Sequence, residues 1–243
     1  YPGVVFSQFS GAEQMARKYG LSRDELDAYA LQSHQRAAQA REHWAGQIVP
    51  VQARSAEAGP LGELHTQDEG VRANATLEGI ASVKLLQDGG VISAANASQI
   101  CDGASAVMVV NERGLKALGV PPLARVHHMS VLGHDPVIML EAPIPATQRA
   151  LQKTGMRLQD IDLYEVNEAF ASVALAWQKA LDADPARLNA QGGAIALGHP
   201  LGASGTRLAT TLIHALHQSG GRYGLQTMCE GGGMANVTVF ERC

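Results

Sequence analysis

The stretch "IDLYEVNEAFASVALAWQKAL" (residues 161–181) decides the fold class of this chain. Its first six residues are typical of a strand, and the residues that follow are typical of a helix. Asn167 stands at the junction, where an Asn is a good helix N-cap. Alternatively, the Asn167 amide points into a cleft at the strand end, where the sites of α/β proteins collect. The stretch predicts an α/β unit with a candidate site residue at its turn.

The same alternation of strands and helices continues on both sides of this stretch. Strands are expected at 47–51, 91–92, 107–110, within 120–133, and at 223–229 and 235–241. Helices are expected at 12–19, 22–46, 112–118, 145–156 and 206–221, the second of them opened by an S-x-x-E capping box. Residues 53–80 are polar and are expected to form a loop. The pattern predicts a layered α/β fold.

The composition excludes several classes of protein. The length of 243 residues fits one large domain or two smaller ones. A net charge of -4 gives no basic surface for nucleic acid. No run of 18 apolar residues predicts a membrane span, and no signal peptide is recognised. The three cysteines, Cys101, Cys229 and Cys243, form no disulfide or zinc pattern, so we expect no metal and a reduced, cytoplasmic location.

Two glycine-rich stretches carry candidate reactive groups. "GGAIALGHPLGASGTR" (192–207) holds His199, and "CEGGG" (229–233) begins with Cys229. A lone His in a glycine loop is more often structural, yet glycines let the backbone approach a ligand closely. The helix that follows His199 offers free N–H groups, which favour a thiolate or an oxyanion. A Cys is usually a small buried hydrophobe, but the glycines leave room beside the Cys229 sulfur.

Taken together, "NEAF", "GGAIALGHPLGASG" and "CEGGG" in this order resemble the thiolase family. "KYGLSRDELDAYALQSHQRAAQA" (18–40), "DEGVR" (68–72) and "NASQICDGASAV" (96–107) are also similar to thiolase motifs, so the resemblance covers essentially the whole chain. It implies acyl transfer between coenzyme A thioesters and a cysteine. The implied reaction is thiolytic cleavage of 3-ketoacyl-CoA, or the reverse Claisen condensation of two acetyl-CoA molecules.

The resemblance also implies catalytic roles. His199 would be the base that activates the nucleophilic cysteine, and it would share in an oxyanion hole. Cys229 would be a general acid/base that moves the α-proton of acetyl-CoA. Asn167 would orient a water that completes a second oxyanion hole. These residue types fit the chemistry, because thioester reactions pass through an oxyanion and a thiol needs a base to become a nucleophile.

Coenzyme A is implied as a cosubstrate, with no permanently bound cofactor. Arg72 would lie near its nucleotide, although a solvated loop charge is the alternative for this residue. Ser98 would lie near the pantetheine. Met139 would line the acyl pocket, and four further residues would line the pantetheine tunnel: Ala94, Ile100, Ala169 and Phe170.

The resemblance implies a layered αβαβα subunit that forms homodimers or homotetramers. Residues 1–95 would be most of the loop domain, 96–119 the last strand and helix of the amino-terminal core, and 120–243 the carboxy-terminal domain with a βαβαβαββ core. The family's nucleophile lies ahead of the loop domain and has no counterpart here. We therefore expect the chain to be inactive alone, and to expose an apolar sheet face that lowers its solubility.

Two alternatives remain open on the sequence. A non-catalytic CoA-binding or assembly subunit, completed by a partner chain, would also lack the nucleophile. The direction of the reaction is open too, although "MLEAP" (139–143) and "QTMCEGGGMANVTVFER" (226–242) look more like degradative thiolases. In "MLEAP", Leu140 and Glu141 stand where the family often has small residues, which predicts a reshaped acyl pocket.

Overall fold

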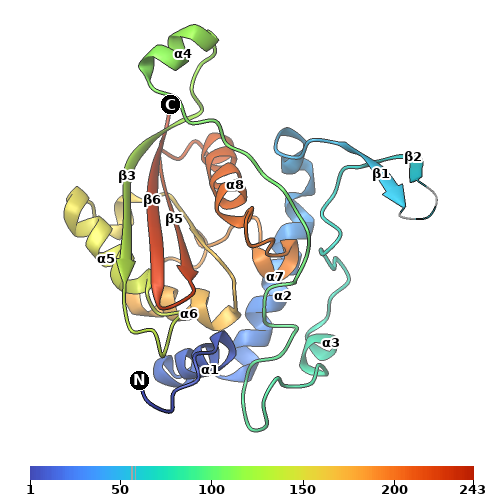
Figure 1. Cartoon of the computed structure of the whole chain (residues 1–243), viewed down its shortest axis with the longest axis vertical. Coiled ribbons are helices and arrows are strands. Elements are labelled where there is room, and N and C mark those ends of the chain that lie inside the picture. Colours follow the sequence, from blue (N-terminus) through green and yellow to red (C-terminus); the bar gives the residue numbers. More distant parts are fainter. Residues whose placement is uncertain (56, 58) are drawn as a thin grey trace.

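The computed structural model describes residues 1–55, 57 and 59–243 and is built on a four-stranded sheet (Figure 1). The strand order is β3-β6-β5-β4. The strands span Ala124–Gly133 (β3), Leu163–Val166 (β4), Tyr223–Glu230 (β5) and Met234–Arg242 (β6). β3–β6 and β6–β5 are antiparallel, whereas β5–β4 is parallel. The strands expected at 223–229 and 235–241 are therefore present as the antiparallel pair β5 and β6.

Helices cover both faces of this sheet. α5 (Pro143–Thr154) and α6 (Ala171–Leu181) lie on one face, where Leu225 and Val237 join the main apolar core. α8 (Ser204–Ser219) lies on the other face, where its Leu212 packs with Phe240 of β6. The packing under α8 is close, because a Cβ at Gly224 would lie 2.8 Å from the Leu212 side chain. The layered α/β prediction is confirmed.

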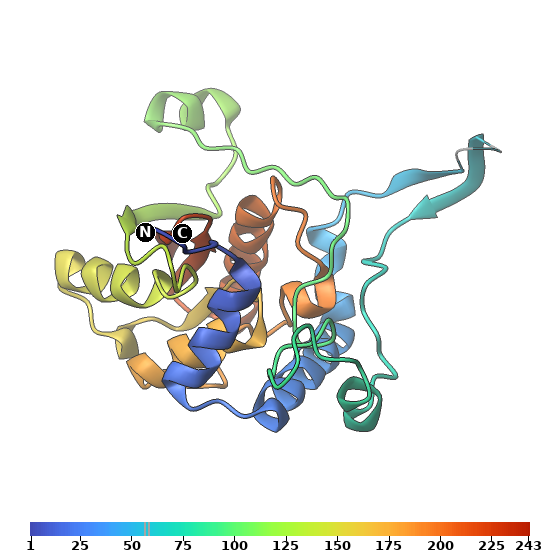
Figure 2. The same ribbon diagram turned by 60° about the horizontal axis from the view of Figure 1, so that its bottom comes forward.

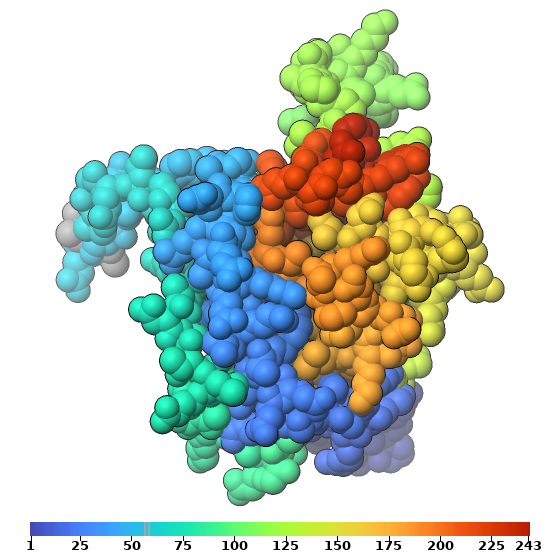
Figure 3. Space-filling model, turned by 180° about the vertical axis from the view of Figure 1, so that it is seen from behind, coloured from blue at the N-terminus to red at the C-terminus, as the bar shows by residue number. Residues whose placement is uncertain are grey.

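Two amino-terminal helices form a further layer outside α6. α1 (Gln8–Tyr19) packs on α6, and α2 (Arg23–Gln39) packs on α6 and on the short α7 (Ala194–Leu197). Figures 2 and 3 show the blue α1 and α2 lying beside the orange segment. Ser22 and Glu25 form the predicted capping box at the start of α2. The expected helix over 22–46 is divided, because residues from Ala40 to Gly46 form a 3₁₀ helix, η1. A second 3₁₀ turn, η2, spans Leu158–Asp160.

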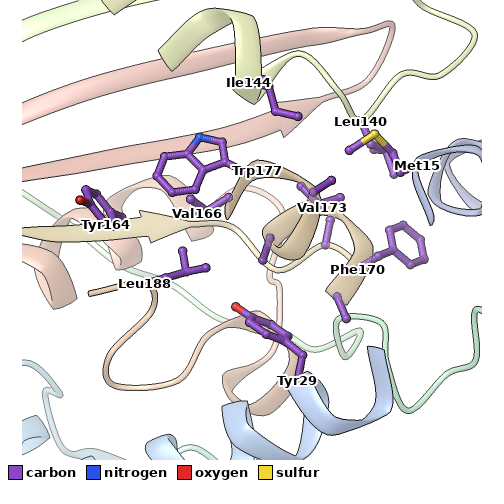
Figure 4. Close-up of a cluster of buried hydrophobic side chains, with 14 of the residues drawn as sticks. Met15, Tyr29, Leu140, Ile144, Tyr164, Val166, Phe170, Val173, Trp177 and Leu188 are labelled. Carbon is purple, nitrogen blue, oxygen red and sulfur yellow. The ribbon is translucent and has the colours of Figure 1, made fainter. Parts of the chain in front are cut away.

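The core between the sheet and α6 is centred on Trp177 (Figure 4). Its ring lies 5.3 Å from that of Tyr164 in β4, and both side chains are buried. The indole N–H donates to the Thr147 hydroxyl of α5 at 2.9 Å. One large side chain thus joins β4, α5 and α6, which position the residues at the end of β4.

Four expectations about secondary structure are wrong. Residues 107–110 form no strand, and 91–92 form none either; the neighbouring Ser93 makes only an isolated bridge to Leu85. A strand needs a neighbour for its N–H and C=O groups, and residues 107–110 have no paired strand within the described ranges. Their apolar side chains are consequently exposed, Val109 to 78%. The helix expected next, α4 (Glu112–Leu118), is present but has no buried residue.

The other two errors concern residues 47–80. The strand expected at 47–51 is absent up to Pro50, because β1 begins only at Val51, and the polar region 53–80 is not simply a loop. β1 (Val51–Ser55) and β2 (Gly59–His65) form an antiparallel hairpin, and α3 (Leu77–Ala81) follows it. Figures 1 and 2 show this hairpin projecting from the body of the molecule. The alternation rule fails here because neither face of the hairpin is packed against a core. Across the described residues, every helix is too short or too polar to span a bilayer.

One buried carboxylate lies in β4, on the face that α8 covers. Glu165 is 3% exposed, and its Oε2 has no hydrogen-bond partner among the described residues. Burial, and then the charge of Glu168, raise the pKa of Glu165 well above its usual value. Arg207 and Arg36 act in the opposite direction but do not cancel this shift.

Replacing Trp177 with Ala should destabilise the protein strongly, because it empties the centre of the core. We expect a loss of about 3–5 kcal/mol in the free energy of unfolding, measured by urea denaturation. The matched control Leu118→Ala, in α4, removes a side chain that is 47% exposed and should change stability little. Equal losses for the two variants would contradict this description of the core.

Replacing Glu165 with Gln should remove a pH-dependent loss of stability. A carboxyl with a raised folded pKa contributes fully below its unfolded pKa, about 4.3, and that contribution is lost as pH rises through the folded pKa. The stability of Glu165→Gln relative to the parent should therefore increase from pH 4.5 to 8.5, in urea unfolding at each pH. For each pKa unit by which the folded protein raises the pKa of Glu165, this relative stability should increase by about 1.4 kcal/mol in total. The control Glu42→Gln, at an exposed position, should follow the parent curve; if Glu165→Gln follows it too, the side chain is not neutral when folded.

Candidate active site

Asn167 and Cys229 lie at the carboxyl ends of two neighbouring parallel strands. Val166 of β4 pairs with Thr227 of β5, so Asn167 is one residue past this pair and Cys229 is two residues past it. The Asn167 backbone N–H also donates to the Thr227 carbonyl at 3.0 Å. The N-cap interpretation of Asn167 is wrong, because Phe170 is the N-cap of α6. The Asn167 side chain is instead turned towards His199.

The His199 ring is held from both of its nitrogens. Its Nε2 lies 3.3 Å from Nδ2 of Asn167, and its Nδ1 lies 2.5 Å from the Ser204 hydroxyl. The Ser204 hydroxyl donates to the Pro200 carbonyl at 3.0 Å, so its oxygen accepts from the ring. The network thereby assigns the neutral Nδ1–H tautomer. Nε2 is left as the basic nitrogen, accepting from the Asn167 amide.

Burial sets the charge state of this imidazole. It lowers the pKa of His199, so the ring is neutral at pH 7. The backbone N–H of His199 donates to the Gln99 carbonyl at 2.9 Å. Gly198, just before it, has a φ of 88°, a conformation that favours glycine. α8 begins five residues later at Ser204, and the positive end of a helix dipole favours negative charge. The loop therefore holds a neutral base in a region that favours anions.

The Cys229 thiol is protonated at rest. Cys229 is half-buried, and burial raises its pKa to about 12, with the charge of Glu230 adding to the shift. A thiol in this state is a poor nucleophile and a competent proton donor. The site thus has a neutral acid near the end of β5, and a neutral base in the loop after α7 that contacts Asn167 at the end of β4.

Among the described residues, one acceptor atom of the Asn167 side chain has no hydrogen-bond partner. Its Oδ1 is buried and makes no hydrogen bond to any described residue, while Nδ2 points at His199. A buried polar atom of this kind costs free energy unless it is paired, and ordered water is a common partner. The carboxamide can therefore hold a water beside the imidazole.

Glu168, next to Asn167, fixes the backbone of the site. Its carboxylate accepts from Tyr29 and Ser33 of α2, from Asn189, and from the backbone N–H of Ile195, at 2.7–3.1 Å. The approach is so close that a Cβ at Gly193 would lie 2.3 Å from the Glu168 carboxyl carbon. Sequence reasoning quoted "NEAF" but gave Glu168 no role. The available signal was a single acid between a strand and an apolar helix.

Two of the residues expected to contact CoA line a cavity of about 390 Å³. These are Arg72 and Ala94, both of them exposed. The Arg72 backbone N–H donates to Nδ1 of His34 at 3.2 Å, and burial, followed by the Arg72 charge, lowers the pKa of His34. His34 lines the same cavity and was missed, because one polar residue on a helix gives no distinguishing signal. The remaining lining comprises Asn74, Ala75, Thr76, Gly79, Ile80, Val83, Ala95, Gln99 and Ile195.

The other expected residues are not among those that line this cavity. The Ser98 N–H donates to the Ala169 carbonyl at 3.0 Å, and Phe170 forms a bridge with Ala97, so these positions are adjacent. Ile100 is fully exposed and is not part of the cavity lining. Met139 is half-buried in the segment between β3 and α5 and has a left-handed backbone, with φ 56°.

Comparisons with known proteins match both parts of the chain to one family. Residues 8–113 match the family model described as "Thiolase, N-terminal domain", and residues 120–242 match "Thiolase, C-terminal domain". The chain is 53% identical to the steroid 3-ketoacyl-CoA thiolase FadA6 of Mycobacterium tuberculosis, over 100% of this chain and 58% of that protein. It is 42% identical to the 3-ketoacyl-CoA thiolase of Bacillus subtilis, over 100% of this chain and 64% of that protein.

Solved structures show the same fold. The acetyl-CoA acetyltransferase of Bacillus anthracis superimposes with a TM-score of 0.93 at 36% identity, over 100% of this chain and 61% of that chain. Human mitochondrial 3-ketoacyl-CoA thiolase in complex with CoA gives 0.87 at 38% identity, over 96% and 58%. The chain therefore spans about three-fifths of the length of these relatives. By these matches the chain belongs to the thiolase family.

Proposed function

We propose that this chain supplies the acid–base and oxyanion groups of a CoA-dependent acyl transfer, run in the direction of 3-ketoacyl-CoA thiolysis. The observation that carries the proposal is the contact of His199, held as the Nδ1–H tautomer, with Asn167 at the end of β4, while Cys229 lies near the end of the neighbouring β5. The similarity to thiolases from several organisms supports the same reaction class.

In this proposal His199 acts first. Its unprotonated Nε2 takes the proton of a nucleophilic thiol, and the thiolate attacks the 3-keto carbon of the substrate. The bond between the second and third carbons then breaks. Its electron pair goes to the leaving acetyl-CoA as an enolate, and the shortened acyl group stays on the nucleophilic sulfur.

Cys229 then acts as the acid. Its thiol proton passes to the enolate carbon and releases acetyl-CoA. A pKa of about 12 keeps this thiol protonated at neutral pH until the more basic enolate forms. The CoA thiol finally gives its proton to the Cys229 thiolate and attacks the acyl–enzyme thioester. The nucleophilic sulfur leaves as a thiolate and takes back the proton held by His199, so the shortened acyl-CoA is released and both groups return to their resting state. A water held by Asn167, together with His199, would donate to the developing oxyanions.

We propose that none of the chain's three cysteines is the nucleophile. Cys229 is the resting acid, and Cys243 is exposed in the last position. Cys101 is exposed, in a position where the resemblance implies Ser or Asn. The 243 residues alone should therefore give no thiolysis.

Each proposed role can be tested in the protein expressed from its complete coding sequence. We expect His199→Asn to lower kcat about 100- to 10,000-fold, the usual contribution of a general base. Asn167→Ala should cost about 100- to 1,000-fold. The assay is CoA-dependent consumption of acetoacetyl-CoA and of a longer 3-ketoacyl-CoA. Cys101→Ser is the matched control and should keep the parent rate, and thiolysis by the purified 243-residue chain would overturn the proposal.

The proposed CoA contact of Arg72 is tested by calorimetric titration with CoA. Arg72→Ala should weaken binding about tenfold, because a charge-assisted hydrogen bond to a phosphate is lost, at about 1.5 kcal/mol. Arg113→Ala, an exposed arginine of α4, is the matched control. Equal affinities for the two variants would remove Arg72 from the site. CoA binding by a complete protein without any turnover would instead favour a non-catalytic CoA-binding or assembly subunit.

A further inference from the structure

Each of three buried side chains beneath α8 has an acceptor atom that no described residue pairs. They are Glu165 of β4, its register partner Gln226 of β5, whose Nε2 donates to the Gly205 carbonyl of α8, and Asn167 just past the end of β4. All three are at most 5% exposed, and the unpaired atoms are Oε2, Oε1 and Oδ1, respectively. A buried acceptor costs free energy unless it is paired, so these atoms indicate a donor other than a neighbouring side chain.

Glu165 and Asn167 line one small cavity, of about 20 Å³. Ser204, Arg207 and Thr211 of α8 line it too, and the rest of the lining is glycine or apolar. A cavity of about 10–15 Å³ is enough for one water, provided that about two to four polar groups surround it. This cavity meets both conditions for a single water molecule.

The polar groups that α8 contributes to the cavity are already engaged. The Ser204 hydroxyl donates to a backbone carbonyl at 3.0 Å, and the Thr211 hydroxyl donates to Oε1 of Gln47 at 3.2 Å. Arg207 forms a bidentate ion pair with Asp68, at 2.8 and 2.9 Å. No hydroxyl proton of this wall is therefore left for the unpaired acceptors.

The charges that face Glu165 leave its carboxyl protonated. Arg207 and Arg36 favour the carboxylate, but the first is ion-paired elsewhere and the second donates to backbone carbonyls. Glu168, two residues later, disfavours the carboxylate, and the His199 ring is neutral. Burial therefore prevails and keeps the pKa of Glu165 well above its usual value. A protonated carboxyl has one O–H to donate, whereas a carboxylate only accepts.

We infer that this cavity binds one ordered water, which together with the protonated Glu165 holds the Asn167 carboxamide with Oδ1 towards the cavity and Nδ2 towards His199. The inference rests on the proposed function, in which Glu165 becomes a positioning residue that touches no substrate. The Asn167 oxygen has a second lone pair, so the water in the cavity does not displace one on the substrate side.

The orientation of the Asn167 amide matters to the base. Turned by half a rotation, the amide would set Oδ1 against the unprotonated Nε2 of His199, and two acceptors would face each other. An ionised Glu165 would favour this reversal, because the water would bring two protons to three buried acceptors and a reversed amide would add a donor. The O–H of neutral Glu165 removes the shortage and keeps the orientation that leaves Nε2 basic.

Kinetics compare Glu165→Leu and Glu165→Gln with the parent, in the protein expressed from its complete coding sequence. Glu165→Leu has no proton to donate, so kcat for acetoacetyl-CoA should fall about tenfold, the effect of one lost hydrogen bond, while KM changes less than about twofold. Glu165→Gln keeps an N–H donor in the same place, and its kcat should stay within about twofold of the parent value.

The matched control is Glu241→Leu. It replaces another buried carboxylate of the same sheet, at the end of β6, where Glu241 pairs with Arg125 and Arg222. This control should keep the parent kcat and KM. A role of Glu165 in stability alone would lower the stability of Glu165→Leu and leave its kcat unchanged.

Two measurements on the parent do not depend on catalysis. A crystal structure of the complete protein should show one water in hydrogen-bond contact with both Glu165 and Asn167. The infrared spectrum at neutral pH should contain the carbonyl band of a protonated carboxylic acid, which shifts in heavy water and is lost in Glu165→Gln. These measurements decide the inference even if Glu165→Leu does not fold.

The outcomes separate this inference from the proposed function. Equal kcat values for the parent and a folded Glu165→Leu overturn the inference and leave the proposed function standing, and so does a comparable loss in Glu165→Gln. A crystal structure without that water, or an infrared spectrum without that band, also overturns it. A parent that cleaves no 3-ketoacyl-CoA overturns the proposed function, whereas the crystal structure and the infrared spectrum still test the water and the protonated Glu165.

Discussion

The candidate site depends on one buried carboxylate, Glu168. Its four hydrogen bonds come from α2, from Asn189 in the segment that pairs along β4, and from the first turn of α7. Burial raises the pKa of Glu168, while Ser33, Ile195, Tyr29 and Asn189 lower it. A buried acid with every donor in place is tolerable, whereas the loss of one donor leaves an uncompensated group. This balance forces three separate segments into one arrangement.

The catalytic geometry follows from that arrangement. Asn167 directly precedes Glu168, and α7, which Glu168 anchors through Ile195, leads into Gly198 and His199. The contact of 3.3 Å between Asn167 and His199 is therefore set by a residue that touches neither partner's side chain. The glycines of the His199 loop serve packing and chemistry together. Gly193 admits the Glu168 carboxylate, while Gly198 provides the turn that exposes the imidazole to Asn167.

Local signals predicted much of this structure from the sequence. Capping, apolar periodicity and glycine stops located α2, α5, α8, β5 and β6, because these signals act within a few residues. Residues 107–110 have strong strand propensity but no neighbouring strand within the described ranges, and propensity alone cannot supply one. The site was predicted through short motifs. Ser204 and the cavity shared by Glu165 and Arg207 were missed because these contacts depend on the folded geometry, and Arg207 lies far from Glu165 in sequence.

Burial shifts the pKa values of the two reactive groups in opposite directions, yet with the same result. It lowers the pKa of His199 and raises that of Cys229, because in each case the charged form is disfavoured. Both groups are consequently neutral at rest, one as an acceptor and the other as a donor. Under the proposed function, charge would appear only on the nucleophilic thiolate, the oxyanions and the enolate. The start of α8, five residues after His199, and the Asn167 amide, which contacts the His199 ring, are two fixed dipoles of this site. A site of low polarity with a few aimed donors therefore favours transient anions over resting ones.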